Sequence, residues 1–599
     1  MIIRKQNLLG WVMALGAAFL FTKCTQPQDN HAKYIPKQAL AVFSVDLQQL
    51  YQKGNLKSLK NSAGFKKWKA ELMEEDDEMN DLVLENLNDP AKIGLDFQKK
   101  IFFYTYSGGG AFSSNIGLVA AMQNADNFEK TLKLADKDVE IKKDKEGYSY
   151  IEKDKYSAIG WNDQVMIMIK SEEGSGIRSR LRARSYLHSF FNLDDENSLA
   201  ANKNFNKFLA KDNDFSVWYS LQSAKKGMTS ALSAYRYSSR DQQLLDEILD
   251  FKDSYVQYSL NFEKGQVLFD IQYDLNKNLQ KFYKGTYGKN LSKALLSRIP
   301  HDQLLGFMGF SWNFKGLFDW LKRVEGVEEA FEKQAKEIDL SADELLEALQ
   351  GELVIAMTGF EKFEIEEKKS PYGDYLNQML EEHDVDPDQL ADFRKRLDEI
   401  PRKVRTTYAP EMLGIVSFKS DMIPKKIMET LKIFASANKV EDKPYYQIEL
   451  VDMPFFIVAQ KQQLMVSNQR KLLEQMLDKG KSGRLADNKM IREATNYNNY
   501  MYMNLSFDKF PKSTQQNIKD QLQGKFGKLQ ESLSLFENFK ARGKDYQARM
   551  ELNLSDKSKN SLEVILRTVW SRYDYGGRII IDLIYIDVVV PEGTEVDTR

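Results

Sequence analysis

The chain has 599 residues, which is too many for a single hydrophobic core, so we expect two or more domains. Hydrophobic residues make up 42% and charged residues 29%, a balance typical of a folded globular protein. The 85 basic and 87 acidic side chains give a net charge of −2, which argues against a nucleic-acid-binding protein, because such a protein needs a basic surface to neutralise phosphates.

The N-terminus has the pattern of a targeting segment followed by a linker. A basic pair precedes an apolar run over 8–21, which suits a secretory signal and is short for a membrane span of roughly 20 residues. Cys24, the only cysteine of the chain, follows after Thr22 and Lys23, and a polar, proline-containing stretch comes next. We predict a lipoprotein signal peptide over 1–23, lipid attachment at Cys24 and a tether over 24–37. The alternative is an ordinary signal peptide, or an uncleaved anchor, with an incidental cysteine.

Two long blocks of the chain repeat one order of predicted elements. The first block, over 38–280, begins with an alternating strand that runs into a helix, ALAVFSVDLQQL. A helical region, paired strands, another helix and hairpin-like strands follow, and a hairpin closes the block. The second block, over 300–570, repeats this order from QLLGFMGFSWNF onward. The shared order predicts an internal duplication. The alternative is that any two stretches of mixed helices and strands look alike at this level.

The blocks differ most at an insert in the second one, over 361–410. This segment is highly charged, and we predict that it is largely helical. Large insertions into a repeated scaffold often carry function, so the insert is a candidate contact region; the alternative is a solvated decoration. The tail over 571–599 is predicted to be rich in strands, and it either completes a sheet or offers an edge to a partner.

The element pattern also predicts the fold class. Runs of paired strands with short turns indicate antiparallel sheets, and the helices join them without a regular alternation of strand and helix. We therefore predict an α+β fold of two tandem related repeats, each an antiparallel sheet with packed helices. The sequence also indicates where some helices begin and end. Ser341 and Glu344 predict a capping box, and Gly351 lies just past the end of that helix.

Little in the sequence points to catalysis. The histidines lie far apart, without the spacing of metal ligands, at His31, His188, His301 and His383. The acidic run over 74–81 lacks the glycine turn and the spaced ligands of a calcium loop. We therefore predict no catalytic residue, metal or cofactor. A carboxylate pair of a glycan hydrolase stays open, because such pairs come from distant positions and the chain has many acids.

One basic segment is a candidate binding site. RSRLRARS places four arginines within seven residues, at Arg178, Arg180, Arg182 and Arg184. Such a cluster suits an anionic glycan, a lipid headgroup or a protein partner. The alternative is a solvated face on which the arginines pair with nearby acids.

Several segments resemble a known family. ALAVFSVDLQQL, the turn NDPAKIGLD, the strand pair around WNDQVMIMI and the later GELVIAM resemble a family of Bacteroidota cell-envelope lipoproteins whose domain is of unknown function. The resemblance covers most of the chain after the leader and supplies no catalytic residue. It implies an exported, lipid-anchored protein. Only one acid, Asp29, lies close behind Cys24. By this resemblance, the scarcity of acids there favours an outer-membrane lipoprotein that faces the periplasm over one displayed on the surface.

These observations lead to one expected function and two alternatives. We expect a membrane-anchored protein, without catalytic activity, that binds or organises an envelope protein or a glycan. The first alternative is an envelope hydrolase that acts on glycans through carboxylates. The second is an accessory subunit of an export or uptake system.

Overall fold

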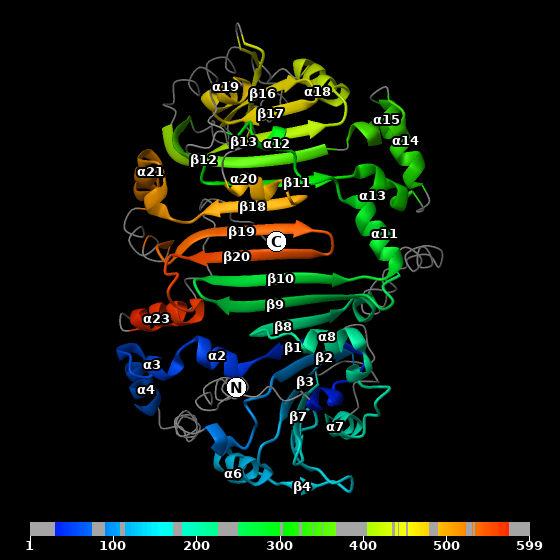
Figure 1. Ribbon diagram of the computed structural model, residues 1–599, viewed down its shortest axis with the longest axis vertical. Helices are drawn as coiled ribbons and strands as arrows, with labels where there is room; N and C mark the ends of the chain where they lie inside the picture. The colour runs from blue at the N-terminus through cyan, green and yellow to red at the C-terminus, as the bar shows by residue number, and fades with distance from the viewer. Residues whose placement is uncertain are drawn as a thin grey trace, which may run out of the picture. The chain divides into compact units, whose positions relative to one another are not determined.

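A computed structural model of the protein describes residues 30–74, 90–107, 114–171, 183–225, 250–299, 304–322, 326–337, 340–349, 351–366, 404–433, 438–440, 443–450, 453–478, 489–522, 530 and 533–573. Contacts divide the chain into two compact units. Unit 1 combines the chain up to Lys281 with the chain from Tyr546, and unit 2 comprises Phe282–Asp545. Each unit contains an antiparallel sheet and packed helices (Figure 1), so the predicted α+β class is confirmed.

Unit 1 is built on one antiparallel sheet. Its strands pair in the order β4-β5-β6-β7-β3-β2-β1-β8-β9-β10-β20. Some strands, such as FSVWYS of β8, alternate between more and less buried residues, because successive side chains of a strand point to opposite faces. Others, such as VMIMIK of β7, are apolar almost throughout. Their bounds are β1 Ala39–Val45, β2 Ile101–Ser107, β3 Ser114–Ala121, β4 Lys142–Lys143, β5 Ser149–Asp154, β6 Ser157–Trp161, β7 Val165–Lys170, β8 Phe215–Ser220, β9 Tyr255–Glu263, β10 Gln266–Asp274 and β20 Gln547–Leu554.

The sheet of unit 1 is buried on both faces around β3. Val119 belongs to one core, which includes Leu187 of α7, whereas the preceding residue, Leu118, belongs to a second core with Phe128 of α6. Neighbouring residues on a strand face opposite sides, so helices cover both sides of β3. The helices and 3-10 helices of this unit are η1 Asn30–Tyr34, α2 Leu47–Lys53, α3 Leu56–Leu59, α4 Ala63–Glu74, η2 Pro90–Ile93, α6 Ala125–Ala135, α7 Ala183–Phe191, η4 Leu199–Ala201, α8 Lys203–Leu209 and α23 Ser561–Tyr573.

The folded body begins inside the segment that we predicted as a tether. Asn30–Tyr34 form η1, and the next residue, Ile35, is completely buried in the core of unit 1. Pro36 forms a β-bridge with Ser198. The structure therefore differs from the predicted tether over 30–37, because apolar residues after position 30 pack in the core. The predicted signal peptide over 1–23 and residues 24–29 of the predicted tether lie outside the described part of the chain.

The C-terminal part of the chain completes unit 1. Strand β20 pairs along its length with β10, and α23 packs against α4, where the rings of Phe65 and Trp570 lie 5.5 Å apart. The second predicted repeat ends at residue 570, whereas unit 2 ends at Asp545. The closing hairpin predicted at 545–569 is instead a strand followed by a helix. The predicted tail starts inside α23, and residues 574–599 lie outside the described part of the chain.

Unit 2 is likewise built on paired antiparallel strands. Its strands pair in the order β14-β15-β16-β17-β13-β12-β11-β18-β19, which is the order of the first nine strands of unit 1 with each strand number raised by ten. The bounds are β11 Gly306–Trp312, β12 Gly351–Glu366, β13 Val404–Phe418, β14 Asn438–Lys439, β15 Tyr446–Leu450, β16 Met453–Gln460, β17 Gln463–Ser467, β18 Asn499–Asn504 and β19 Phe536–Lys544.

Helices pack on the sheet of unit 2 in two cores. One core joins Phe307, Val354 and Leu413 of the sheet to Leu295 of α12 and Leu473 of α19. A second core joins Phe418 to α14, α15 and α18. The helices are α12 Lys293–Leu296, α13 Phe314–Leu321, α14 Val327–Glu337, α15 Ala342–Ala348, α18 Met422–Ile433, α19 Arg470–Leu477, α20 Lys489–Ala494, η6 Phe507–Lys509 and α21 Lys512–Leu522, and α11 Lys277–Thr286 leads from unit 1 into unit 2.

The predicted insert begins and ends as strand. Residues 361–366 continue β12 and residues 404–410 begin β13, and the two strands pair from Glu366↔Val404 onward. The helical prediction is therefore wrong at both ends, where the hairpin extends instead, and residues 367–403 lie outside the described part of the chain.

The predicted helix start at Ser341 is confirmed, but the predicted role of Gly351 is not. The Ser341 hydroxyl accepts a hydrogen bond from the Glu344 backbone N–H at 3.2 Å, and the Glu344 carboxylate accepts one from the Ser341 N–H at 2.9 Å. Gly351 opens β12 instead of capping the helix. A Cβ there would lie 1.8 Å from the Ser417 carbonyl oxygen, so the close strand pairing requires glycine. Among the described residues, no helix combines the length and the apolar character needed to cross a membrane.

Candidate functional site

Only one of the predicted site residues lies in the described part of the chain. Cys24, Arg178, Arg180 and Arg182 lie outside it, whereas Arg184 is in the first turn of α7. Its guanidinium lies 3.6 Å from the Asp144 carboxylate and 4.7 Å from the centre of the Tyr150 ring. Arg184 is thus paired with an acid and an aromatic ring, the arrangement expected of a solvated structural face, although its side chain is about half exposed.

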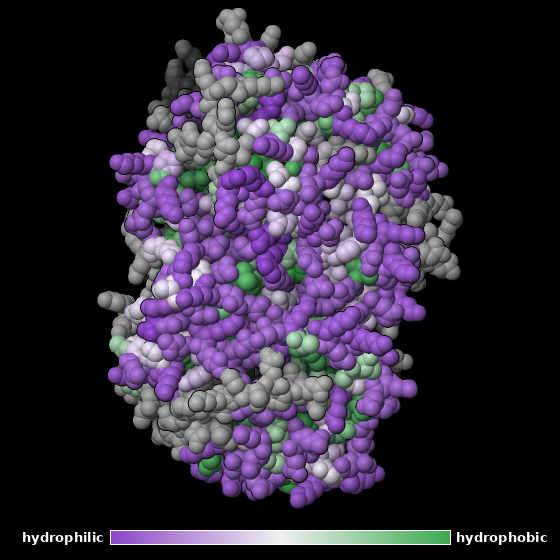
Figure 2. Space-filling model, in the orientation of Figure 1, coloured by the Kyte–Doolittle hydropathy of each residue, from purple (hydrophilic) through white to green (hydrophobic). Residues whose placement is uncertain are grey.

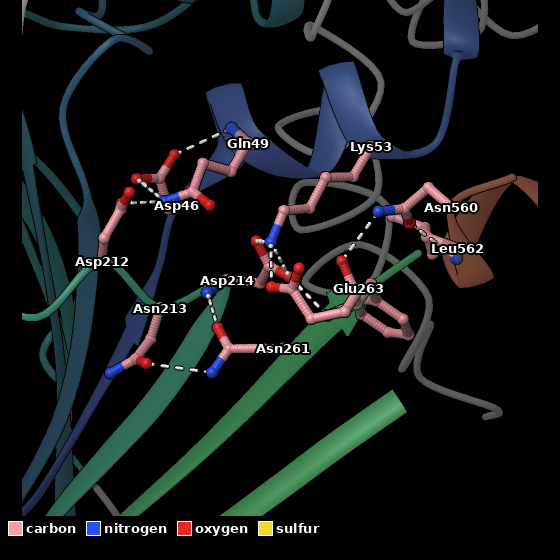
Figure 3. A network of polar contacts seen from close by, with 11 residues as sticks. Asp46, Gln49, Lys53, Asp212, Asn213, Asp214, Asn261, Glu263, Asn560 and Leu562 are labelled. Carbon is pink, nitrogen blue, oxygen red and sulfur yellow. Dashed lines mark hydrogen bonds and ion pairs between the residues drawn. The ribbon is translucent and has the colours of Figure 1, made fainter. Parts of the chain in front are cut away.

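The most buried charge pair of unit 1 joins Asp214 to Lys53 (Figure 3). Asp214 precedes β8 and its side chain is completely buried, while Lys53 ends α2. The Lys53 ammonium lies 3.0 Å from each carboxylate oxygen, and the Phe262 backbone N–H donates to Oδ2 at 2.6 Å. Burial raises the pKa of the Asp214 carboxyl, and the contacts with Phe262 and Lys53 oppose this shift.

The network continues outward from Lys53 to solvent. The ammonium also lies 3.2 Å from the Glu263 carboxylate, which is 45% exposed, whereas Lys53 is 20% exposed. Asn261 accepts from the Asp214 backbone N–H at 3.1 Å and donates to the Asn213 side chain at 3.0 Å. The Asp214 Oδ2 atom thus accepts from Phe262 and Lys53, and Oδ1 lies beside the Lys53 ammonium.

The same network ties distant segments together. Asp46 caps α2 by accepting from the Gln49 N–H at 2.9 Å, and its own backbone N–H donates to the Asp214 carbonyl at 2.9 Å. Asn560 donates to the Phe262 carbonyl at 2.8 Å and caps α23 by accepting from the Leu562 N–H at 3.0 Å. Figure 3 shows these residues converging from α2, β8, β9 and the start of α23. We conclude that this network is a structural junction of unit 1.

A pair of carboxylates lies at a β-bulge in unit 2. The register of β12 and β13 shifts between Met357 and Gly359, where Gly359 pairs with Glu411 and Glu361 pairs two residues further along. Thr358 donates to the Glu411 carboxylate at 3.1 Å, and Gln469 donates to the Glu361 carboxylate. Burial raises the pKa of Glu361, and the charge of Glu411 raises it further. A carboxyl group whose pKa is raised by burial and by a neighbouring carboxylate is an arrangement that acid–base catalysis uses.

Unit 2 also carries an apolar strip on the sheet face opposite its main core. We call it the methionine surface, and it consists of Met308, Ile355, Met357, Met412, Met501 and Met503. Met308 pairs directly with Ile355 and Met501, and Met357 pairs with Met412. Gly306 lies between Met357 and Met503, and it has no side chain that could cover them. Met308 and Met412 are 40% and 39% exposed, and the other four side chains are half-buried.

This strip differs from scattered exposed hydrophobic residues. Figure 2 shows a largely hydrophilic face with small separated hydrophobic areas, which is ordinary for a protein surface. The six residues of the methionine surface instead adjoin one another on β11, β12, β13 and β18, neighbouring strands that are visible in Figure 1. Methionine side chains are flexible and polarizable, so such a surface adapts to the apolar side chains of a partner.

Comparison with protein families shows which family the chain belongs to. Residues 31–562 match the family described as Domain of unknown function (DUF4836). The chain belongs to this family. Among curated proteins, none is significantly similar to it. The DUF4836 match begins at His31, within η1, and ends in the first turn of α23, so it spans both units and includes the strand that completes unit 1.

Two solved structures give faint similarities to this DUF4836 chain. The structure of TP0453 in crystal form III has 10% sequence identity and a TM-score of 0.22, and the match covers 43% of this chain and 84% of that chain. Crystal form IV of TP0453 has 9% identity and the same TM-score, with 40% and 79% covered. A TM-score of 0.22 is too low to establish a common fold.

The sequence offered little signal for these clusters in the DUF4836 chain. Lys53, Asp214 and Glu263 come from three distant segments, and each is an ordinary charged residue in its own segment. The methionine surface also arises only when β18 pairs with β11. An alternation of methionine with other residues in NYMYMN was its one visible sign. In the described ranges, no three His, Cys, Asp or Glu side chains gather in a way that suits a metal ion.

Proposed function

We propose that this protein is an exported envelope lipoprotein of a Bacteroidota bacterium, anchored through Cys24, that binds an envelope protein without catalysing a reaction. The methionine surface is the observation that supports the binding of an envelope protein. Six adjoining apolar side chains on four strands form a contiguous partly exposed patch, and such patches on soluble proteins often mark interaction sites. The partner that fits it is a protein segment presenting apolar side chains.

Substitution of the two most exposed members tests the binding part. The double variant Met308→Ser and Met412→Ser should recover at least about tenfold less partner from cross-linked envelopes, because each apolar side chain removed from a contact costs about 1 kcal/mol or more. Leu134→Ser is the matched control, since Leu134 is 55% exposed on α6 and lies outside the surface. Equal recovery from all three proteins would contradict the proposal.

The membrane is the second proposed partner. Support comes from the apolar run over 8–21 and the single cysteine behind it. In this proposal the protein is an outer-membrane lipoprotein facing the periplasm. The mass of the N-terminal peptide of protein purified from its native membrane tests this: a diacylglyceryl-modified peptide beginning at Cys24 is expected. An unmodified terminus elsewhere would remove the anchor from the proposal.

Glu361 and Glu411 favour one second candidate function, an envelope glycan hydrolase. Their carboxylates lie on paired strands, and Glu361 has a raised pKa, as a general acid requires. If the protein is such an enzyme, purified protein will release reducing ends from envelope glycans, and Glu361→Gln will reduce the rate by at least about 100-fold. A rate equal in the wild type, the variant and a blank would exclude this candidate.

The equal strand order of the two units supports an internal duplication, which we propose as their origin. An accessory role in an export or uptake system is compatible with the same binding surface. In that case the partner identified by cross-linking would be a subunit of such a system.

A further inference from the structure

Ten buried polar atoms in unit 1 have no hydrogen-bond partner among the residues that the structure describes. Four of the ten belong to residues on neighbouring strands. They are the hydroxyl oxygens of Tyr104, Tyr106 and Ser171 and the side-chain nitrogen of Asn115. Tyr104 is completely buried, and the other three residues are no more than 7% exposed. Buried polar groups in proteins are nearly always hydrogen-bonded, so four unpaired atoms on neighbouring strands call for a physical explanation.

The sheet register places the four side chains that carry these atoms on one face of the sheet around β3. Tyr106 of β2 pairs directly with Asn115 of β3. Because Ile116 pairs with Lys170 of β7, the same register places the next residue, Ser171, opposite Asn115. All three side chains therefore share one face of three adjacent strands.

Tyr104 reaches the same place from the next position on β2. Its partner on β3 is Gly117, and a Cβ at Gly117 would lie 2.1 Å from the ring carbon Cζ of Tyr104 and 2.5 Å from its hydroxyl oxygen. The tyrosine ring thus lies over the glycine and directs its hydroxyl across β3. Phe190 of α7 packs edge-on against both tyrosine rings, so this face is the covered one.

The chemistry of the four groups selects the kind of molecule that they bind. The Asn115 nitrogen only donates hydrogen bonds. Burial raises the pKa of both tyrosines, so their hydroxyls stay protonated and can donate as well. A matching molecule must accept hydrogen bonds. It must also be uncharged, because moving an ion into this aromatic core would cost far more than four neutral hydrogen bonds return.

We propose that Tyr104, Tyr106, Asn115 and Ser171 form an internal binding site for a small uncharged molecule that accepts hydrogen bonds through oxygen. The shared chemistry has two sources, ordered water and the carbonyl or hydroxyl oxygen of a small organic molecule. Either source satisfies groups that would otherwise destabilise unit 1. This site is independent of the anchor and of the methionine surface.

Deleting single polar atoms tests the site. If a molecule is bound, each deletion lowers the Tm, and if the polar atoms are simply unpaired, each deletion leaves the Tm unchanged or raises it. If a molecule is bound, Tyr106→Phe and Ser171→Ala each lower the Tm of unit 1, by about 2–4 °C, because each removes a hydrogen bond. The double variant should lose less than the sum, since both groups contact one molecule. Both substitutions keep the ring or the small volume, and far-UV circular dichroism verifies the fold.

Tyr51→Phe is the matched control. The Tyr51 hydroxyl is also buried without a partner in the described part of the chain, but it lies on α2, apart from the four groups. Removing a lone unpaired hydroxyl should leave the Tm unchanged or raise it. If Tyr106→Phe and Ser171→Ala behave like this control, the proposed site does not exist.

Mass spectrometry of a solvent extract of the purified protein then separates the two sources. An organic compound present at about one per chain in the wild type, and lost from the Tyr106→Phe, Ser171→Ala double variant, would identify an organic ligand. Lowered Tm values without such a compound would identify ordered water. Both results support the site, and the Tm values alone decide whether it stands.

Discussion

At the scale of single residues, Asp214 shows what a buried charge requires. Its carboxylate lies inside unit 1 with one cation in direct contact, Lys53, and that cation reaches solvent beside Glu263. The burial of Asp214, Lys53 and Glu263 therefore predicts how strongly a substitution in this network destabilises unit 1. A buried charge left without its partner is costly, whereas an exposed pair contributes little.

Substitution of Lys53 tests this ranking. Lys53→Met should lower the free energy of unfolding of unit 1 by about 3 kcal/mol at neutral pH, because Asp214 stays buried without its counter-ion. Glu263→Gln should cost less than about 1 kcal/mol, since Glu263 is 45% exposed. Urea unfolding of the purified variants measures both values, and equal costs would contradict the ranking.

The pH dependence of the Lys53→Met variant adds a second check. The pKa of buried Asp214 is already raised, and it will rise further without Lys53. An acid with a raised folded-state pKa favours folding at low pH and loses that contribution as the pH rises through its folded pKa. The deficit of the variant should therefore shrink as the pH falls from 7 towards 4.

His31 predicts a pH dependence of the opposite sign. Its ring is buried, its Nε2–H donates to the Lys100 carbonyl at 2.7 Å, and burial, aided by the charge of Lys99, lowers its pKa from 6.5 to about 4. Such a histidine stabilises the fold above pH 6.5, and this contribution is lost as the pH falls towards 4. The loss should amount to about 3 kcal/mol.

His31→Gln separates this contribution from all others. Glutamine can still donate to the carbonyl but does not titrate, so the variant should lose about 3 kcal/mol less than the wild type between pH 6.5 and 4. His188→Gln is the control, because His188 is 44% exposed on α7. Chemical unfolding at both pH values measures the difference. Parallel stability curves for the wild type and His31→Gln would contradict the assignment.

At the scale of elements, the packing of α23 on α4 depends on a glycine. A Cβ at Gly64 in α4 would lie 1.9 Å from the Trp570 carbonyl oxygen in α23. Helix propensity alone predicts that alanine in place of a helical glycine stabilises by about 1 kcal/mol. The contact predicts the reverse, because backbone atoms cannot yield as a flexible side chain does.

Gly64→Ala should therefore destabilise unit 1 by about 1–3 kcal/mol, in the range of other overpacked sites. Gly285→Ala in α11 is the matched control, since a Cβ there meets its nearest neighbour at an ordinary 3.7 Å. That substitution should be neutral or slightly stabilising. Calorimetry of the two variants compares them directly, and a stabilised Gly64→Ala protein would refute the packing.

Local patterns predicted many elements, but not their long-range partners. The strand and helix of ALAVFSVDLQQL formed as expected, with Asp46 as the helix cap, because alternation and capping are local properties. The failures required information from distant segments. Nothing local in 545–569 indicates that β20 pairs with β10. The charged start of the insert likewise became strand only because residues 404–410 pair with it.

At the scale of the whole molecule, the chain order has a consequence for folding. Unit 1 contains the first part of the described chain and also β20 and α23 from its end. The edge of β10 is therefore completed only when the chain up to Leu554, the end of β20, is available. An unpaired strand edge invites association with other chains, so the edge of β10 is protected only once β20 has been synthesised and has paired with it.

The binding function is the central claim, and site-specific photo-cross-linking in living cells tests it most directly. A benzophenone side chain placed at position 308 or 412 should yield the same discrete adduct with an envelope protein, because both positions lie on the methionine surface. Placed at position 134, which is more exposed but outside that surface, it should yield none. No adduct from 308 and 412, or one indistinguishable from that at 134, would contradict the proposal.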